Sequence, residues 1–118
     1  MPYKYINIEY LDSVSGGDIA LIREIVDMFR DQCVDIYNEM KSNLSSKNYS
    51  LLGQLAHKAK SSVAIMGMTD MAAMLKTFEL HAKEGKEPEL YASYIERFKK
   101  ETKAAVLEYE DLIKNRLK

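Results

Sequence analysis

The sequence predicts an all-α protein, an antiparallel up-and-down four-helix bundle with a short N-terminal helix. Apolar residues recur every three or four positions through most of the 118-residue chain, which is the period of a helix with one buried face. The chain has only five Gly and two Pro, and they fall where this periodicity stops. The connections are therefore only a few residues long, which favours antiparallel neighbours in a bundle.

The first two predicted elements are a short segment and a long helix. Apolar residues at positions 6, 8, 10 and 11 mark the short one. A turn over residues 15–18 follows, and Asp18 can accept a first-turn amide hydrogen bond as the N-cap of the long helix. The apolar stripe of that helix consists of Ile19, Ile22, Ile25, Val26, Phe29, Cys33, Ile36, Tyr37, Met40 and Leu44. The polar run over residues 45–48 ends it.

Three further apolar stripes complete the bundle. One runs from Leu52 to Met66, with Gly67 suited to the left-handed position just past a helix end. We expect Thr69 to cap the next helix, which carries Met71, Met74, Leu75, Phe78 and Ala82 and stops at Gly85. The last helix is expected to start at Pro88 and to run for about eight turns through Tyr91, Ile95, Phe98, Val106, Tyr109 and Ile113.

Composition narrows the class of protein. A chain of this length fits one domain, here residues 1–118. Its 17 Lys and Arg against 18 Asp and Glu give a net charge of −1, which argues against nucleic-acid binding. The lone Cys33 cannot form an internal disulfide and favours the cytoplasm. No apolar run in the sequence approaches the length that a membrane-spanning helix needs. We expect the protein to be a monomer. Met1 favours a free-standing chain over a piece cut from a longer protein.

Sequence motifs for metal or nucleotide chemistry are lacking. Helix bundles hold metals through Glu-x-x-His pairs, but Gln54 stands three residues before His57 and Phe78 three before His81. There is no phosphate-binding glycine loop and no H-E-x-x-H motif. We therefore expect no metal site, no nucleotide site and no autonomous kinase activity. Cys33 and the four methionines between positions 66 and 74 are interpreted as core residues.

The two histidines differ in their predicted surroundings. At about 100° per residue, His57 points roughly 150° away from the apolar stripe of its helix, and so faces water. The residues expected on the same surface, most of them small, are Gly53, Gln54, Lys60, Ser61 and Ala64. His81 lies at the edge of an apolar face, where a partly buried packing role is expected. Geometry alone leaves open whether His57 is reactive or an ordinary surface histidine.

The segment over residues 57–67 resembles the phosphoacceptor helix of histidine phosphotransfer (Hpt) domains of two-component phosphorelays. Six residues match that family's pattern in place, namely His57, Lys60, Ser62, Ala64, Met66 and Gly67. The likeness spans the whole chain, from Leu11 through Gly16, Gly17 and Asp18 to Leu75, Glu79, Ala82 and Gly85 in the helix after the motif. Two positions depart from the pattern: Ser61 stands where the family usually has Gly, and Lys58 is bulkier than the common residue.

The resemblance implies a phosphorelay intermediate. His57 would accept a phosphoryl group, through Nε2, from a histidine kinase or a receiver aspartate and pass it to another receiver aspartate. Lys60 would stabilise the phosphoryl charge, and Gly53, Gln54, Lys58, Ser61 and Ala64 would form the docking face. Such a chain is a phosphocarrier, not an enzyme. It would need no cofactor of its own, because Mg²⁺ would come with the receiver.

A second interpretation remains open. The bundle could be a non-catalytic interaction module that docks a receiver or a kinase while His57 is never phosphorylated, because Ser61 blocks access. A metal-binding bundle is a third, disfavoured by the spacing around the two histidines.

Overall fold

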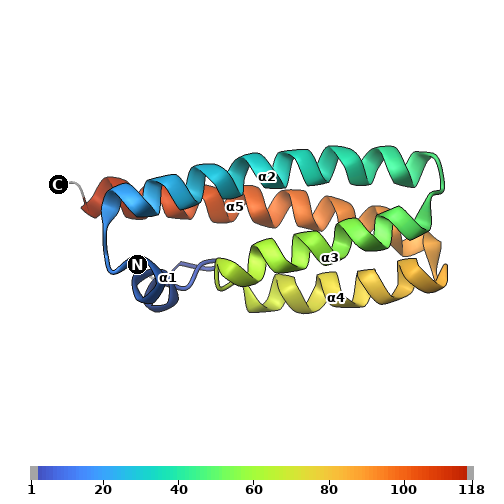
Figure 1. Ribbon diagram of the computed structural model, residues 1–118, viewed down its shortest axis with the longest axis horizontal. Coiled ribbons are helices and arrows are strands. Elements are labelled where there is room, and N and C mark those ends of the chain that lie inside the picture. The colour runs from blue at the N-terminus through green and yellow to red at the C-terminus, as the bar shows by residue number, and fades with distance from the viewer. Residues whose placement is uncertain (1–2, 117–118) are drawn as a thin grey trace.

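A computed structural model describes residues 3–116 and confirms the all-α bundle with its short N-terminal helix (Figure 1). The described elements are α1 (Ile8–Ser15), α2 (Ile19–Ser45), α3 (Tyr49–Ile65), α4 (Thr69–Glu84), the 3₁₀ turn η1 (Pro88–Leu90) and α5 (Tyr91–Arg116). None of the described helices is both long enough and apolar enough to span a membrane.

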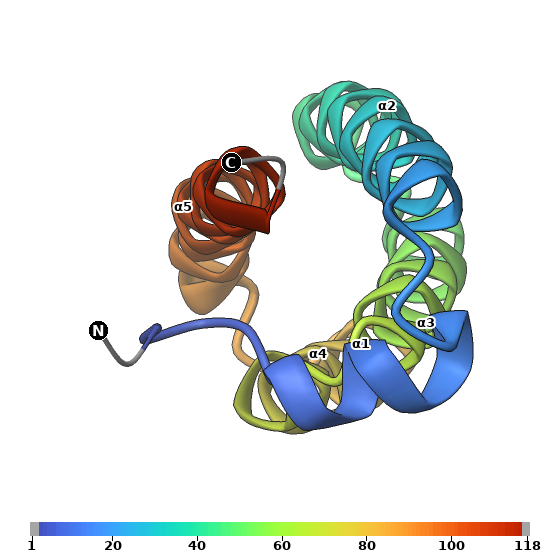
Figure 2. The ribbon, with the colours of Figure 1, turned by 90° about the vertical axis from the view of Figure 1, so that its left-hand side faces the viewer.

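The four long helices run antiparallel to their neighbours along the chain and surround one core. Seen end-on, α2, α3, α4 and α5 lie around a common interior, and α1 crosses the end formed by α3 and α4 (Figure 2). Figure 1 shows α2 beside α5 and α3 beside α4. The α3–α4 pair carries His57, which lies on α3.

The N-terminal part of the described chain is attached to α5 at two places. The Glu108 carboxylate accepts hydrogen bonds from the three consecutive amides of residues 4–6, at 2.9, 2.8 and 3.2 Å. At the C-terminal end of α5, Arg116 donates to both carboxylate oxygens of Asp12 in α1, at 2.6 and 3.0 Å. These contacts hold α1 and the segment before it over the end of the bundle.

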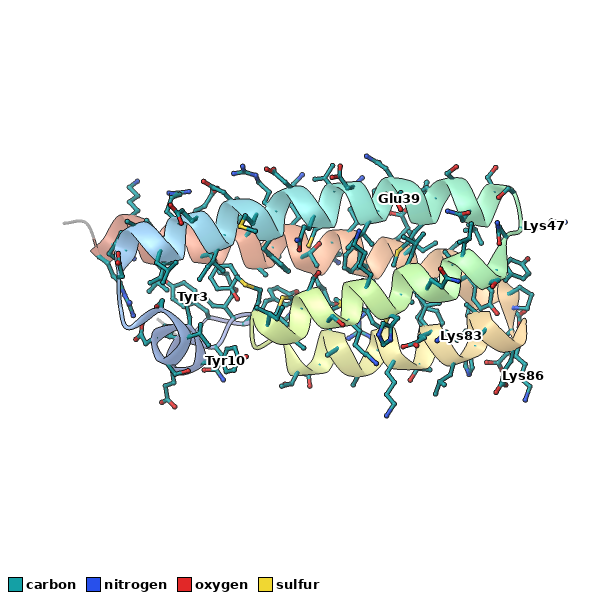
Figure 3. The ribbon with its side chains drawn as sticks, viewed as in Figure 1. Tyr3, Tyr10, Glu39, Lys47, Lys83 and Lys86 are labelled. Atoms are coloured by element: carbon teal, nitrogen blue, oxygen red, sulfur yellow. The ribbon has the colours of Figure 1, made fainter. Side chains whose placement is uncertain are left out.

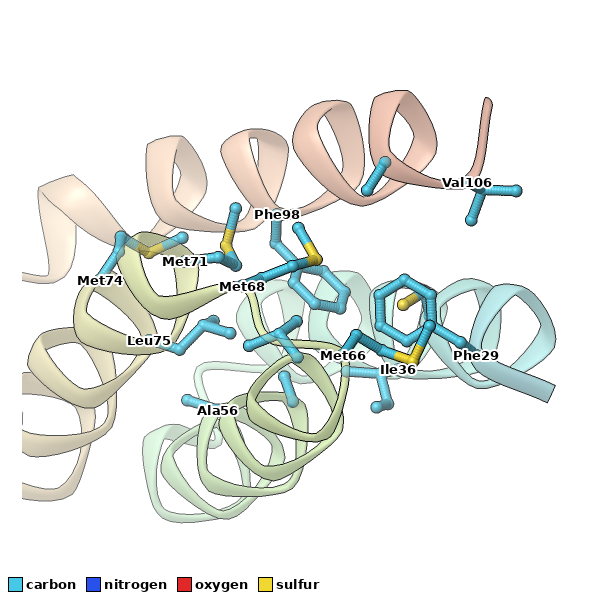
Figure 4. Packing of buried hydrophobic residues seen from close by; sticks show 14 of the residues in the cluster. Phe29, Ile36, Ala56, Met66, Met68, Met71, Met74, Leu75, Phe98 and Val106 are labelled. Atoms are coloured by element: carbon cyan, nitrogen blue, oxygen red, sulfur yellow. The ribbon is translucent and has the colours of Figure 1, made fainter. Parts of the chain in front are cut away.

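The core contains the apolar stripes of all four long helices (Figure 4). Met66, Met68, Met71 and Met74 are buried, which confirms that the methionine-rich segment is core. The phenol of Tyr109 donates a hydrogen bond to the backbone oxygen of Met66 at 2.8 Å, so this buried hydroxyl has a partner. Cys33 is also buried, and burial raises the pKa of its thiol to about 12, which makes it a packing residue instead of a nucleophile.

Helix ends agree with the sequence at most points and differ at two. Asp18 caps α2 by accepting from the amides of residues 20 and 21, and Gly67 adopts a left-handed φ of 76° just past α3. The prediction that Thr69 caps α4 is wrong. Met68 occupies the N-cap, with no side-chain hydrogen bond, and Thr69 is already the first helical residue. Pro88 begins a 3₁₀ turn, so the last α-helix starts at Tyr91, three residues later than predicted.

Candidate functional site

His57 lies in the middle of α3 and its side chain is 58% exposed, which confirms the predicted orientation towards water. The ring is nevertheless not free on all sides. Its Nδ1 lies 3.0 Å from Oε2 of Glu79, which projects from the facing helix α4. One nitrogen of the imidazole is thus engaged by a carboxylate from a neighbouring element.

Glu79 is the centre of a small charged cluster. Its residue is only 7% exposed, yet three groups contact its carboxylate. Lys83 Nζ lies 2.7 Å from Oε2, His57 Nδ1 lies 3.0 Å from the same oxygen, and Lys60 Nζ lies 3.3 Å from Oε1. These hydrogen bonds, that of Lys83 first, lower the pKa of Glu79 to about 2 against the opposing effect of burial. Glu79 is therefore ionised at neutral pH.

The ionised carboxylate fixes the tautomer of the neutral His57 ring. A carboxylate without a proton can only accept hydrogen bonds, so Nδ1 must carry the hydrogen that bridges to Glu79. In the neutral imidazole the other nitrogen, Nε2, then has no proton and keeps its lone pair. The site consequently presents a nucleophilic nitrogen on an exposed ring held by a second helix.

The other residues predicted around His57 differ in how far they are exposed. Lys60 is half-buried between the helices and contacts Glu79. Gln54, Lys58, Ser61 and Ala64 are exposed, as the helical spacing predicts. The Ser61 hydroxyl donates to the backbone oxygen of His57 at 3.3 Å, so it bonds the main chain four residues earlier and not the ring.

Gly53 was predicted on this exposed surface, and that prediction is wrong. The residue is buried in the α3–α4 contact. A Cβ at this position would lie 2.8 Å from Cγ of Lys83, 3.3 Å from the Lys83 backbone nitrogen and 3.4 Å from the Glu79 backbone oxygen. The periodicity of α3 cannot show this, because the covering atoms belong to α4.

His81 behaves as the helical pattern predicts. Its side chain is 28% exposed, and its ring centroid lies 6.5 Å from that of Tyr94 in α5. Nδ1 is buried and makes no hydrogen bond within residues 3–116, since the nearby Glu87 oxygen is 3.6 Å away. His81 is thus the packed histidine and His57 the accessible one. Among the described residues, no three His, Cys, Asp or Glu side chains lie close enough together to hold a metal ion.

Sequence reasoning missed the roles of Glu79 and Lys83. The available signal was the position of Glu79 on the apolar face of its helix, four residues after Leu75 and three before Ala82. A carboxylate at such a position needs partners, and Lys83 stands four residues later on the same side of the helix. The third partner, His57, is 22 residues away and is brought close only by helix packing.

A protein-family model matches most of the chain. The chain matches the family model described as "Hpt domain" over residues 24–113, which includes His57 and all three partners of its cluster. No curated protein and no solved structure matches it. Hpt domains carry out histidine phosphotransfer in two-component relays, as phosphocarriers that interact with receiver domains and histidine kinases. Because the family model covers more than half of the sequence, the chain belongs to the Hpt domain family.

Proposed function

We propose that this protein is a phosphorelay intermediate and that His57 carries the phosphoryl group. The observation that carries this proposal is the hydrogen bond between His57 Nδ1 and Glu79. It leaves Nε2 unprotonated on a ring that is 58% exposed, which is the state that a nucleophile at phosphorus requires.

The proposed reaction moves one phosphoryl group between two side chains. The lone pair of Nε2 attacks the phosphorus of a receiver's phosphoaspartate in line, the N–P bond forms, and the P–O bond to the aspartyl oxygen breaks. The receiver carboxylate leaves with the bonding electron pair. Transfer to a second receiver is the same step in reverse. The Glu79 carboxylate stabilises the positive charge that develops on the attacking ring, since it already accepts the Nδ1 hydrogen.

Lys60 supplies charge compensation in this proposal. Its ammonium lies one helical turn after His57 and 3.3 Å from Glu79, and its side chain is flexible enough to approach a phosphoryl group on the ring. Phosphoryl transfer depends mainly on positioning and charge stabilisation. The exposed residues Gln54, Lys58, Ser61 and Ala64 form the proposed docking face.

The partners that fit this chemistry are a receiver domain and a histidine kinase, including a hybrid one. We expect the receiver to bring Mg²⁺ and its own acidic pocket, and the protein to act without a cofactor or a nucleotide of its own. We further expect a monomer in the cytoplasm, where the single buried thiol of Cys33 would stay reduced.

Replacing His57 tests the proposal directly. His57→Gln should abolish labelling by a receiver carrying radioactive phosphate, because no other exposed imidazole is present among residues 3–116. Helical content and melting should stay essentially unchanged, since an exposed substitution usually costs less than about 0.5 kcal/mol. The label on the parent protein should be acid-labile and base-stable.

His81→Gln is the matched control and should retain the label. If the label persists in His57→Gln, or is lost in a folded His81→Gln, then His57 is not the phosphorylated residue and the proposal is wrong. Receiver binding without any label on the parent protein would instead support the alternative function, an interaction module whose His57 is not phosphorylated.

A further inference from the structure

Lys83 occupies a position that depends on the absence of a side chain at Gly53. The Lys83 Cγ lies where a Cβ of residue 53 would reach, at 2.8 Å. Gly53 stands inside α3, where glycine costs about 1 kcal/mol relative to alanine. The space it leaves lets the stem of Lys83 lie along α4 on the side that faces α3 (Figure 3). The Lys83 ammonium thereby reaches the Glu79 carboxylate from its own helix.

The ammonium and the imidazole share one oxygen. Lys83 Nζ and His57 Nδ1 both contact Oε2 of Glu79, at 2.7 and 3.0 Å, and the lysine makes the shorter contact. Two lysines and one carboxylate give the cluster a net charge of +1 when the ring is neutral. Without Lys83, the negative potential of Glu79 at the ring would increase, and it would favour a proton on Nε2.

We propose that Lys83, held over Gly53, is a positioning residue of the phosphotransfer site that keeps His57 neutral and therefore nucleophilic near neutral pH. This inference rests on the proposed function of His57. Lys83 acts through Glu79, since it contacts the carboxylate and not the ring. Gly53 and Lys83 act together, because the missing side chain at position 53 makes room for the stem of Lys83.

Other lysines also lie near His57 and Glu79, and the test must separate their effect from that of Lys83. On α3, Lys58 and Lys60 neighbour His57, and on α4, Lys76 lies one turn before Glu79. Lys83 differs from Lys58 and Lys76 in its direct contact with Glu79, at 2.7 Å. Lys86, three residues further on, pairs with exposed Glu84 and serves as a control lysine.

The test compares Lys83→Met, Gly53→Ala, the double variant and Lys86→Met. Met keeps the length of the stem and removes the charge. Ala at position 53 displaces the flexible Lys83 stem while it raises helix propensity, so this variant should fold. For each protein, the rate of His57 phosphorylation by phosphoramidate is divided by that of the parent protein at the same pH.

We expect this ratio to fall roughly twofold near pH 6.5 for Lys83→Met and to return to about one near pH 8.5, well above the ordinary pKa of an imidazole. Gly53→Ala should change the ratio in the same direction. The double variant should lose no more than Lys83→Met, because both changes remove the same contact. Lys86→Met should match the parent at every pH.

A second readout does not depend on phosphorylation. Nuclear magnetic resonance of the His57 ring should show that Lys83→Met gains the second ring proton at a pH higher by roughly half a unit or more. A merely structural role for Lys83 would lower the melting temperature without moving this midpoint. A midpoint that does not move in the folded variant, or a rate ratio that is independent of pH, overturns the inference. Absence of phosphorylation in the parent protein contradicts the proposed function instead, and the ring titration still decides the role of Lys83.

Discussion

At the scale of single residues, the surroundings of the two histidines arise partly within one helix and partly from contacts between helices. The exposure of His57 and the partial burial of His81 follow from the angle of each residue to the stripe of its own helix. The bond from Ser61 to the main chain four residues earlier is a common local choice of serine in a helix. The contact with Glu79 depends on how α3 and α4 pack, so periodicity within α3 cannot reveal it.

Ser61 is one of the two residues near His57 at which the sequence departs from the pattern of the Hpt family. Because its hydroxyl bonds the His57 backbone oxygen at 3.3 Å, the side chain occupies surface beside the ring without orienting it. Ser61→Gly should cost roughly 0.5 to 1 kcal/mol of stability, since glycine is the poorer helix former. Receiver affinity or transfer rate should nevertheless rise. Urea unfolding and single-turnover transfer from a phosphorylated receiver measure the two effects.

The control for this substitution is Ser42→Gly, which removes an exposed serine from α2. It should lower stability without a gain in transfer rate. A slower transfer in folded Ser61→Gly would show that the hydroxyl assists the ring, and an unchanged rate would show that serine and glycine are equivalent there.

At the scale of helices, periodicity locates the elements and local chemistry fixes most of their ends. Asp18 and Gly67 occupy the positions that their residue types favour. Thr69 has the right type for a cap, but the turn after Gly67 is one residue shorter than predicted, so Met68 takes that place. Residue type alone does not distinguish an N-cap from the first helical residue, because the backbone angles of the preceding turn decide it.

This difference between two capping candidates can be measured. Asp18→Ala should destabilise the protein by about 1 kcal/mol, since the carboxylate accepts from the amides of residues 20 and 21 at 2.9 and 3.3 Å. Thr69→Ala should change stability by less than about 0.5 kcal/mol, because Thr69 lies inside the helix and alanine is the better helix former. Urea unfolding of both variants gives the comparison. Equal losses would mean that Thr69 contributes as much to its helix as Asp18 does.

At the scale of the whole molecule, the bundle follows from apolar patterning, whereas the links between distant segments do not. Glu79 connects α4 to α3, and Asp12 connects α1 to the end of α5 through Arg116. Partners 22 and 104 residues apart are set by tertiary packing. A net charge of −1 says nothing about which carboxylates are engaged, so the sequence alone could not single out these two.

These two carboxylates should make the whole bundle sensitive to acid. The hydrogen bonds from Lys83 and the other partners lower the pKa of Glu79 from 4.5 to about 2, and those from Arg116 lower the pKa of Asp12 below 3.8. A carboxyl whose pKa is lower in the folded state stabilises it above the ordinary value, and this contribution is lost as the pH falls towards the folded value. The free energy of unfolding of the parent protein should therefore decrease from about pH 5 to about pH 2.

The double variant Asp12→Asn, Glu79→Gln should be less stable than the parent protein at neutral pH. Its free energy of unfolding should decrease less steeply as the pH falls, so that the two proteins become similarly stable in acid. Asp31→Asn, which removes a carboxylate whose side chain is 72% exposed, should keep the slope of the parent. Urea unfolding across this pH range measures the stability of all three proteins. If the plots of unfolding free energy against pH run parallel for the parent and the double variant, then Asp12 and Glu79 are not the source of the acid sensitivity. That sensitivity would then arise elsewhere in the bundle.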